Sequence, residues 1–292
     1  MSIEVNWADP YAGRQGRWYK GNLHTHTSPA SACGAISPAD SLAQYVKLGY
    51  DFLAISDHMG LTADRDKGLV MMPGVEWNSP AGEHAGVYSL DAEIVRGVIG
   101  IADQAALLSH LKGKDALVIL NHPNWQLVPH YRREQLLARQ DYDGIEIYNG
   151  VIERLDGAAI STDKWDYLLV KGRRVLGFAS DDSHCLDDIG LAAIMVRSSA
   201  RDAASILAAI RRGNFYCTTG VEITDIRREG NVIHVQSANG QEVQAISRGG
   251  VRVARVSGPS MSHTLPDGPG YVRFAVYGPG AAMAWTQPFF VE

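Results

Sequence analysis

The sequence predicts an α/β fold for residues 1–220, followed by a small antiparallel β domain in residues 221–292. In the first part, short apolar runs alternate with stretches of helical periodicity, which indicates a mostly parallel sheet with helices outside it. From about Val221 the helical periodicity stops, and six short runs follow, separated by hairpin-type turns such as Asn239-Gly240. This second part carries no cluster of ligand-type residues, so we interpret it as a packing or oligomerisation module.

The expected elements follow from periodicity and from end signals. Ser37 and Pro38 suit the N-cap and the first position of a helix that Gly49 ends. Further helices are expected at 102–111, 132–139, 162–170 and 203–212. Strands are expected at 18–26, 51–55, 70–75, 85–90, 116–120, 144–148, 174–179 and 191–196. The six C-terminal runs are 221–227, 232–236, 242–247, 251–256, 271–277 and 283–291.

The composition is that of an ordinary soluble globular protein. The 292 residues are 46% hydrophobic and 20% charged, and the net charge of −5 with a pI near 6.1 gives no sign of a nucleic-acid-binding surface. No apolar run is long enough to span a bilayer, and the polar N-terminus lacks the apolar core of a signal peptide. We therefore expect a cytoplasmic protein. Three scattered cysteines suggest no disulfide framework.

Histidines and carboxylates gather where the predicted strands end. His24 and His26 follow the first strand, and side chains two residues apart in an extended segment point to the same side. Asp182 and His184 repeat this spacing after the strand at 174–179. Such strand ends are where α/β folds place their active sites. The candidate metal ligands are His24, His26, His58, Glu76, His84, His122, Asp182 and His184.

These residue types favour a hydrolase with several metal ions. A catalytic ion takes about three protein ligands and keeps one position open, so this set suits about two or three divalent ions such as zinc, manganese or iron. Glu76 can bridge two of them. A pair of ions can hold a hydroxide made from bound water and polarise a scissile bond. The sequence shows neither a nucleophile elbow nor a glycine-rich phosphate loop that would compete with this interpretation.

Several neighbouring residues leave alternatives open. Asp57 either contacts a ligating imidazole or caps a loop, and Asp181 either faces away from the site or makes such a contact. Asn121 and Asn149 could bind substrate or cap turns, whereas a cap is the better interpretation for Asn124. We interpret the histidines that do not follow strands as ordinary helix, loop or tail residues, namely His110, His130, His234 and His263.

Five short segments occur in order between residues 18 and 220: 23–27 (Leu-His-Thr-His-Thr), 54–58 (Ala-Ile-Ser-Asp-His), 74–76 (Gly-Val-Glu), 121–123 (Asn-His-Pro) and 180–184 (Ser-Asp-Asp-Ser-His). Each is short, but the ordered set resembles the motifs of the PHP (polymerase and histidinol phosphatase) metallohydrolase family. The segment 213–220 and the tail around 284–288 look similar to the branch of that family that includes carbamate (carbaryl) hydrolases.

This resemblance implies a distorted (β/α)7 TIM-like barrel of the PHP type for residues 1–220, with two or three metal ions. It implies phosphate-ester hydrolysis, and we expect the catalytic residues to be Glu76, Asp182 and His184. It also implies one ion held by His24, His26, Glu76 and Asp182, a second held by Glu76, His84 and His122, and a third held by His58 and His184.

One position departs from the family pattern. Related phosphatases usually carry an Asp, sometimes a His, a few residues after the His-x-His motif as a ligand of the third ion, whereas residues 30–34 contain no carboxylate. Cys33 is the one residue of this segment that could bind a metal, and a thiolate would favour zinc or another soft ion. We interpret Cys33 as a free thiol near the site, so the third position is expected to be weak or empty.

The leading hypothesis is a metal-dependent phosphoesterase acting on a small-molecule phosphate ester. The alternative keeps the metal ions but hydrolyses a carbamate or carboxylic ester, and a second alternative is a non-catalytic metal-binding domain that regulates a partner. Candidate cations for a phosphate group are Arg65, Lys67, Arg132, Arg133 and Arg154. Candidate walls of an apolar pocket are Trp77, Trp125, Tyr148 and Phe178.

Overall fold

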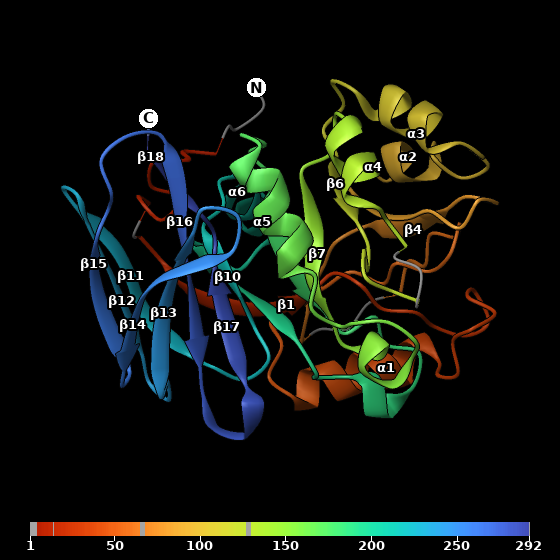
Figure 1. The fold of residues 1–292 in the computed structure, drawn as a ribbon. Coiled ribbons are helices and arrows are strands. Elements are labelled where there is room, and N and C mark those ends of the chain that lie inside the picture. Colours follow the sequence, from red (N-terminus) through yellow and green to blue (C-terminus); the bar gives the residue numbers. More distant parts are fainter. Residues whose placement is uncertain (1–4, 14, 65–67, 127–129, 292) are drawn as a thin grey trace.

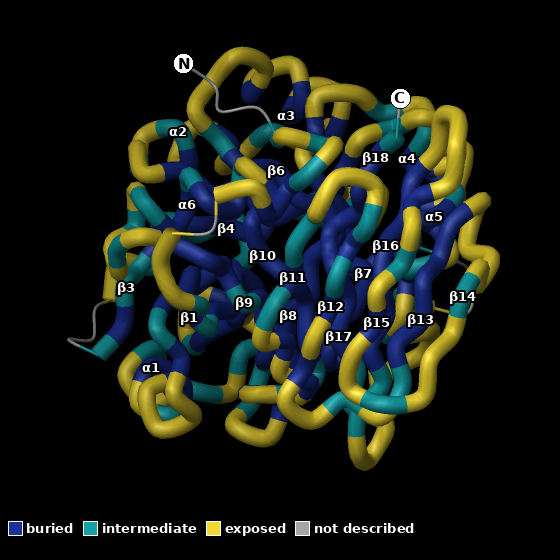
Figure 2. The backbone as a smooth tube through the Cα atoms, turned by 90° about the vertical axis from the view of Figure 1, so that its left-hand side faces the viewer, coloured by how far each residue is buried: buried dark blue, intermediate teal, exposed yellow. Residues whose placement is uncertain are grey.

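The computed structural model describes residues 5–13, 15–64, 68–126 and 130–291, and it has a mixed α/β fold (Figure 1). Its strands form sheets of ten, three and five members. The five-stranded sheet consists, in spatial order, of β4 (Gly74–Asn78), β5 (His84–Tyr88), β6 (Leu117–Leu120), β7 (Gly144–Asn149) and β8 (Leu176–Ser180). Most of the residues in these strands are buried, whereas the loops between elements are mostly exposed (Figure 2).

The ten-stranded sheet joins the first part of the chain to the last. Its members are β1 (Arg17–Asn22), β2 (Phe52–Leu53), β3 (Val70–Met71), β9 (Ala193–Ser198), β10 (Phe215–Thr218), β13 (Glu242–Ser247), β14 (Val251–Ser257), β16 (Gly270–Tyr277), β17 (Met283–Thr286) and β18 (Phe289–Val291). The spatial order is β14-β13-β16-β17-β10-β9-β1-β2-β3, with β18 beside β16. Because β10 pairs with both β9 and β17, the C-terminal strands continue the sheet that contains β1.

The three-stranded sheet covers the C-terminal part of the large sheet. It consists of β11 (Ile223–Glu229), β12 (Val232–Ser237) and β15 (Ser260–Thr264), all antiparallel. Its inward residues Ile226 and Val235 share one apolar core with Val243 and Phe274 of the large sheet. This arrangement matches the antiparallel β segment expected after residue 220, although the division into two domains at that point stays a prediction.

Six α-helices are described, and five of them match predicted ones. They are α1 (Pro38–Lys47), α2 (Ala92–Arg96), α3 (Gln104–Leu111), α4 (Arg133–Ala138), α5 (Thr162–Val170) and α6 (Ala203–Arg211). Ser37 caps α1 by accepting from the backbone of Asp40, as its sequence predicts. In Figure 1, α2, α3 and α4 lie together beside the five-stranded sheet. None of the helices in the described ranges is both long and apolar enough to cross a membrane.

The mostly parallel sheet is only partly present, and a closed (β/α)7 barrel is not confirmed. Within the described ranges, parallel ladders are confined to β1-β2-β3 and β6-β7-β8, whereas β4, β5 and β6 pair antiparallel. The two sheets are linked by two isolated parallel bridges, Thr25↔Ser183 and His58↔Glu76. Both bridges include or adjoin predicted metal ligands, so these ligands converge where the two sheets meet.

One described α-helix and two described strands were not expected, and two expected runs are divided. The unexpected ones are α2, β10 and β15. The run 70–75 is divided into β3 and β4 at Pro73, and the run 283–291 is divided into β17 and β18 at Pro288. Proline has no backbone N–H to donate to a ladder, which explains why pairing stops at both places.

A buried ion pair ties α5 to the C-terminal strands. Arg273 on β16 donates two hydrogen bonds, of 2.8 and 2.6 Å, to the carboxylate of Asp166 on α5, and Tyr271 adds a third of 2.8 Å. Both charged side chains are at most 5% exposed. Because α5 also packs on β7, this contact joins the ligand-bearing sheet to the C-terminal part of the chain.

We expect Arg273→Ala to lower the free energy of unfolding by about 3–5 kcal/mol, because the Asp166 carboxylate would stay buried without its cation. Chemical denaturation followed by circular dichroism would measure the change. The matched control is Arg133→Ala, which removes an exposed pair with Asp163 on the same helix and should cost no more than about 1 kcal/mol. Equal effects of the two substitutions would contradict this interpretation.

Candidate metal centre

Glu76 is the carboxylate on which most of the candidate ligands converge. It lies in β4 and is 1% exposed. Imidazole nitrogens lie 3.1 to 3.3 Å from its two oxygens, with His24, His84 and His122 at Oε1 and His26 and His58 at Oε2. Asn121 donates to Oε1 at 2.8 Å, which gives this asparagine a positioning role. The structure therefore brings together ligands that are up to 98 residues apart, from His24 to His122.

Hydrogen bonds at Nδ1 determine the tautomers of His24 and His26. Nδ1 of His24 lies 2.8 Å from the carboxylate of Glu146, which can only accept, so this nitrogen carries a proton. Ser31 donates its hydroxyl proton to Asp57 at 2.7 Å and therefore accepts from Nδ1 of His26 at 3.1 Å. In the neutral form of each ring, the lone pair is consequently on Nε2.

In the neutral rings, these lone pairs converge on one point. The Nε2 atoms of His24 and His26 are 3.1 Å apart, and each is 3.1 Å from Oδ1 of Asp182. Asp182 is 4% exposed, and its Oδ1 makes no hydrogen bond. Buried acceptor atoms that face one another need a positive partner, and imidazole with carboxylate is a donor set that divalent metal ions prefer. The residues present therefore fit a metal ion.

The pKa values of several candidate ligands are shifted by burial and by the closeness of the other ligands. Burial by itself lowers the pKa of His26, but its contacts with Asp182 and Glu76 outweigh burial and raise the pKa to about 9. Burial raises the pKa of Glu76, yet the facing His24 and His84 hold it well below its usual range. Burial dominates at His58, where the pKa falls to about 4. Without a metal ion, the carboxylates thus retain protons on the nearest imidazoles.

Two of the predicted ligands lie on strained backbone. Asp182 has a φ of 53° and His122 a φ of 30°, a region that residues other than glycine rarely adopt and that costs about 1–3 kcal/mol. The strain is held by specific contacts, because Asp182 N donates to the carbonyl of His24 at 3.1 Å and His122 N donates to Glu146 at 2.7 Å. Both side chains are thereby directed at the ligand cluster.

Glu146 contacts two of the candidate ligands, and the sequence analysis did not include it among the site residues. Its carboxylate, 2% exposed, accepts from His24, from the backbone of His122, from Asn149 and from Ser180. It therefore orients two of the predicted ligands without facing the ions itself. A carboxylate in the middle of the apolar strand Gly144–Asn149 is the signal that could have identified it, because a charge buried there needs partners.

The structure resolves the alternatives for the two aspartates. Asp57 caps the loop after His26, because it accepts from Thr27 N at 2.6 Å and from Ser31 at 2.7 Å, and it is connected to the His26 imidazole only through the Ser31 hydroxyl. Asp181 instead accepts from Tyr45 at 2.9 Å and from the backbone N–H groups of Gly190 and Ala192, and none of these partners is an imidazole. Burial raises the pKa of Asp181 to about 6.

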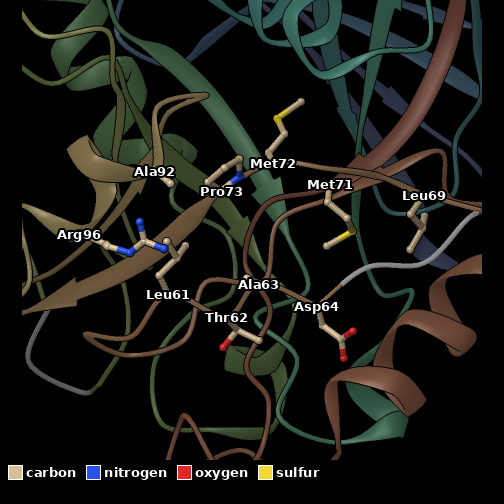
Figure 3. A pocket seen from close by; sticks show the side chains of 10 residues that line it. All are labelled: Leu61, Thr62, Ala63, Asp64, Leu69, Met71, Met72, Pro73, Ala92 and Arg96. Atoms are coloured by element: carbon tan, nitrogen blue, oxygen red, sulfur yellow. The ribbon is translucent and has the colours of Figure 1, made fainter.

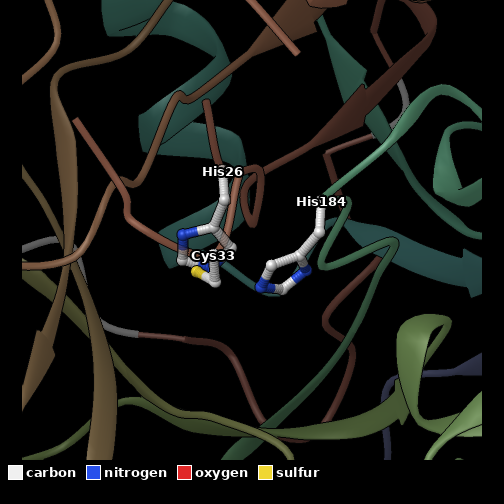
Figure 4. Close-up of side chains that lie close together, drawn as sticks. All are labelled: His26, Cys33 and His184. Atoms are coloured by element: carbon white, nitrogen blue, oxygen red, sulfur yellow. The ribbon is translucent and has the colours of Figure 1, made fainter. Parts of the chain in front are cut away.

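Four groups of side chains could each hold an ion, with ligand atoms within 4.8 Å of one another. They are His24, His26 and Glu76; His24, His122 and Asp182; His58, Glu76 and His84; and His26, Cys33 and His184. The first three share residues of the two ions expected from the family resemblance. The expected third ion was to be held by His58 and His184, but these two residues belong to different groups. His58 is grouped with Glu76 and His84, and His184 is grouped with His26 and Cys33 (Figure 4). Which residues ligate remains a prediction.

His130, interpreted from the sequence as an ordinary loop residue, lies in a loop that brings its ring beside two candidate ligands. Its ring lies 5.2 Å from that of His84 and 4.9 Å from that of His122, centroid to centroid. Trp125 lies 5.1 Å from His122 and 5.4 Å from His130, so these two side chains form an aromatic wall beside the ligands. The sequence did not indicate this position of His130, because the residue follows no predicted strand and belongs to no motif.

Most of the other candidate substrate-contacting residues interact with residues that are not candidate ligands. Trp77 donates to the carbonyl of Ile101, Tyr148 donates to Glu153, and Phe178 packs on Phe215, so none of the three forms a wall of the centre. Asn124 holds a loop, as expected, by donating to Ile160 O and Asp163. Among the cations, Arg133 pairs with Asp163, Arg154 pairs with Asp188, Arg132 is exposed, and Arg65 and Lys67 lie outside the described residues.

A pocket of about 440 Å³ lies next to the loop that follows His58 (Figure 3). Apolar side chains such as Leu61, Met71 and Pro73 line it, and Asp64 and Arg96 stand at its polar part. Thr62 lines the pocket and donates to Asp57, which links it to the network behind His26. None of its lining residues is a candidate ligand, so we treat this pocket as separate from the metal centre.

Comparison with known proteins supports the fold and not a specific reaction. No family model and no curated protein matches the sequence. A two-domain protein from Bacteroides vulgatus, described as containing a predicted PHP-like metal-dependent phosphoesterase, aligns with a TM-score of 0.53 and 14% identity over 100% of this chain and 98% of its own. The lesion-specific endonuclease PfuEndoQ from Pyrococcus furiosus aligns with a TM-score of 0.51 and 12% identity over 66% of this chain and 56% of its own.

These likenesses agree with the resemblance of the motifs at the level of the fold. The Bacteroides vulgatus protein is described as a two-domain protein that contains a PHP-like part, and the alignment does not say which of its residues that part comprises. Neither of the two structures is described as a carbamate hydrolase, so that branch is not confirmed. At 12–14% identity the comparison establishes the fold alone.

We expect Glu146→Ala to weaken metal binding by about 10–100-fold, because His24 and the His122 backbone would lose the carboxylate that orients them. Competition with a chelating indicator would measure the dissociation constant. Glu153→Ala is the matched control, since Glu153 contacts Tyr148 and none of the ligands, and it should leave the affinity unchanged. An unchanged affinity in a folded Glu146→Ala protein would contradict the positioning role.

We expect metal binding to release about one proton or more per chain at pH 7, because the ion must displace the proton that the raised pKa keeps on His26. This release should fall as the pH rises through about 9, where His26 is already neutral. Calorimetric titration in buffers of different ionisation enthalpy would count the protons. Proton release that does not change between pH 7 and pH 10 would contradict the assignment.

Proposed function

We propose that this chain is a metal-dependent hydrolase of the PHP family that cleaves a phosphate ester. The observation that carries the proposal is the convergence of Nε2 of His24, Nε2 of His26 and Oδ1 of Asp182 on one point beside Glu76. That arrangement costs stability unless a cation occupies it, and strained backbone at Asp182 and His122 adds to the cost. Such a cost is expected at a functional site.

The proposed centre holds at least two divalent ions. Its ligands are His24, His26, His58, Glu76, His84, His122, Asp182 and His184, and Glu76 is placed between the groups. Bound divalent ions would lower the pKa of a coordinated water and polarise the ester bond. Glu76, Asp182 and His184 are the proposed catalytic residues because they would hold the ions that act on the ester. Glu146 and Asp57 keep the imidazoles of His24 and His26 in the tautomer that offers Nε2.

Hydrolysis of a carbamate or carboxylic ester is the second candidate, and one observation favours it. Trp125 and His130 form an aromatic wall beside His84 and His122, which suits an uncharged aromatic leaving group. Arg133 and Arg154, which could have received a phosphate group, are instead paired with Asp163 and Asp188. The metal centre is the same in both proposals.

The proposal also includes the domain division, the location and the oligomeric state. We propose two domains divided near residue 220, in agreement with the two-domain Bacteroides vulgatus protein that aligns over the whole chain. We propose a cytoplasmic enzyme with a small-molecule substrate, consistent with the net charge of −5 and the lack of a nucleic-acid-binding surface in the sequence. An oligomer through the C-terminal β segment is compatible with exposed apolar residues on β14, namely Val251, Val253 and Val256.

The deciding experiment offers the zinc- or manganese-loaded protein two substrates that share one leaving group, 1-naphthyl phosphate and 1-naphthyl N-methylcarbamate. We expect naphthol from the phosphate. In Glu76→Ala, the metal content and the turnover should be lost together. Glu76 belongs to two of the ligand groups and contacts His24 and His122 of another. Metal analysis and naphthol fluorescence would provide the two readouts.

Each outcome of this assay has a distinct meaning. Naphthol from the carbamate alone would move the protein to the second candidate. Metal-loaded protein that releases naphthol from neither substrate, nor from other phosphate and carboxylic esters, would support a non-catalytic metal-binding regulator. Full metal content and normal turnover in Glu76→Ala would contradict the proposed centre itself. The Glu153→Ala variant serves as the control for mutation at a carboxylate that faces away from the ligands.

A further inference from the structure

The pocket beside the loop 61–64 lies where the chain passes from one sheet to the other. β3 is the last strand at its end of the ten-stranded sheet, and β4 is the last strand at its end of the five-stranded sheet. Pro73 separates these two strands, and side chains from the loop, from β3 and from α2 line a volume of about 440 Å³ (Figure 3). Sites that take one small molecule have about this size.

The surface of this pocket is mainly apolar. Leu61 and Met71 line it and are only half-buried, although each packs against a core cluster. Leu69, Met72 and Pro73 extend the same surface. An apolar ligand would remove the accessible part of these side chains from water, which is favourable. The thioether of Met71 also makes favourable contacts with aromatic rings.

One cation stands beside this apolar surface. Figure 3 shows Arg96 of α2 reaching toward the side of the pocket where Leu61 and Pro73 lie. Its Nη1 contacts Glu93, and its guanidinium makes no other hydrogen bond within the described part of the chain. This ion pair is exposed, with 53% of the Arg96 side chain and 77% of the Glu93 side chain accessible. Such a pair adds little stability, so the guanidinium can also bind a carboxylate.

The pocket has one carboxylate among its lining residues, that of Asp64. Figure 3 shows Asp64 and Arg96 on different sides of the apolar side chains. A ligand that extends across the pocket therefore meets a cation at one end and an anion at the other. A single carboxylate can face Arg96, whereas a second one at the far end of the ligand would face Asp64 and be repelled. This arrangement favours a monoanion over a dianion.

We propose that this pocket is a binding site for a small organic monocarboxylate with an apolar body. The carboxylate pairs with the guanidinium of Arg96, and the apolar body lies against Leu61, Met71 and Pro73. The site is distinct from the metal centre, because none of its lining residues belongs to a ligand group. This inference goes beyond the proposed hydrolase function, and it depends neither on the metal ions nor on the ester that is cleaved.

The first test records fluorine NMR spectra of 4-fluorophenylacetate during titration with the purified protein. We expect a dissociation constant of about 1 mM or below, which is within reach of a ligand of this size. Arg96→Gln should weaken binding by at least about tenfold, because the charge-assisted pair is lost. Arg133→Gln is the matched control, since this exposed arginine pairs with Asp163 and does not line the pocket. No measurable binding, or equal affinity in Arg96→Gln, would overturn the proposal.

Two further probes test the charge of the ligand. The neutral 4-fluorobenzyl alcohol keeps the aromatic ring but cannot form an ion pair with Arg96. The dianion 2-fluoroterephthalate carries a second carboxylate at the opposite end of the ring, which would face Asp64. We expect both to bind at least about tenfold more weakly than 4-fluorophenylacetate. If the neutral or the dianionic probe binds as tightly, the assignment to a monocarboxylate is wrong.

A second measurement locates the bound probe. In protein labelled with carbon-13 at the methionine methyl groups, the signal of Met71 should shift when 4-fluorophenylacetate is added. Met71→Leu, which nearly conserves volume, identifies this signal by its loss. Met261, buried in the core of the C-terminal strands, is the control whose signal should not move. Binding without a shift at Met71 would overturn the proposal. Neither measurement uses turnover, so a protein that hydrolyses no ester can pass both tests, and an active hydrolase can fail them.

Discussion

The structure depends on a set of buried acceptor atoms that face one another around Glu76 and Asp182. Glu146 and Ser31 take the Nδ1 protons of His24 and His26, so each ring turns a lone pair toward an aspartate oxygen that has no hydrogen bond. In a buried environment such a set is unfavourable unless protons or metal ions compensate it. The raised pKa of His26 expresses the proton form of this compensation, and a bound metal ion would provide the other.

The surrounding fold holds these acceptor atoms close to one another. The ligands do not lie on one closed barrel but at the seam between the five-stranded and ten-stranded sheets, where the bridges Thr25↔Ser183 and His58↔Glu76 join them. Supporting groups come from behind each ligand, with Glu146 on β7 under His24 and Asp57 under Ser31. The strained φ angles of Asp182 and His122 fit the same principle, since local strain persists only where surrounding contacts enforce it.

The centre has two borders with different chemistry. Trp125 and His130 provide an aromatic border beside His84 and His122, and they bear on the choice between a phosphate and a carbamate substrate. Cys33 and His184 lie at an exposed border beside His26.

The sequence by itself determined the α/β class, most helices and strands, and the eight candidate ligands, because strand ends and His-x-His spacing are local patterns. It could not reveal Glu146 or His130, since the first looks like any residue of a buried strand and the second follows no strand. It also left Asp57 and Cys33 open. Tertiary structure alone shows what Glu146, His130 and Asp57 contact, because these contacts join segments far apart in the chain, which local periodicity does not encode.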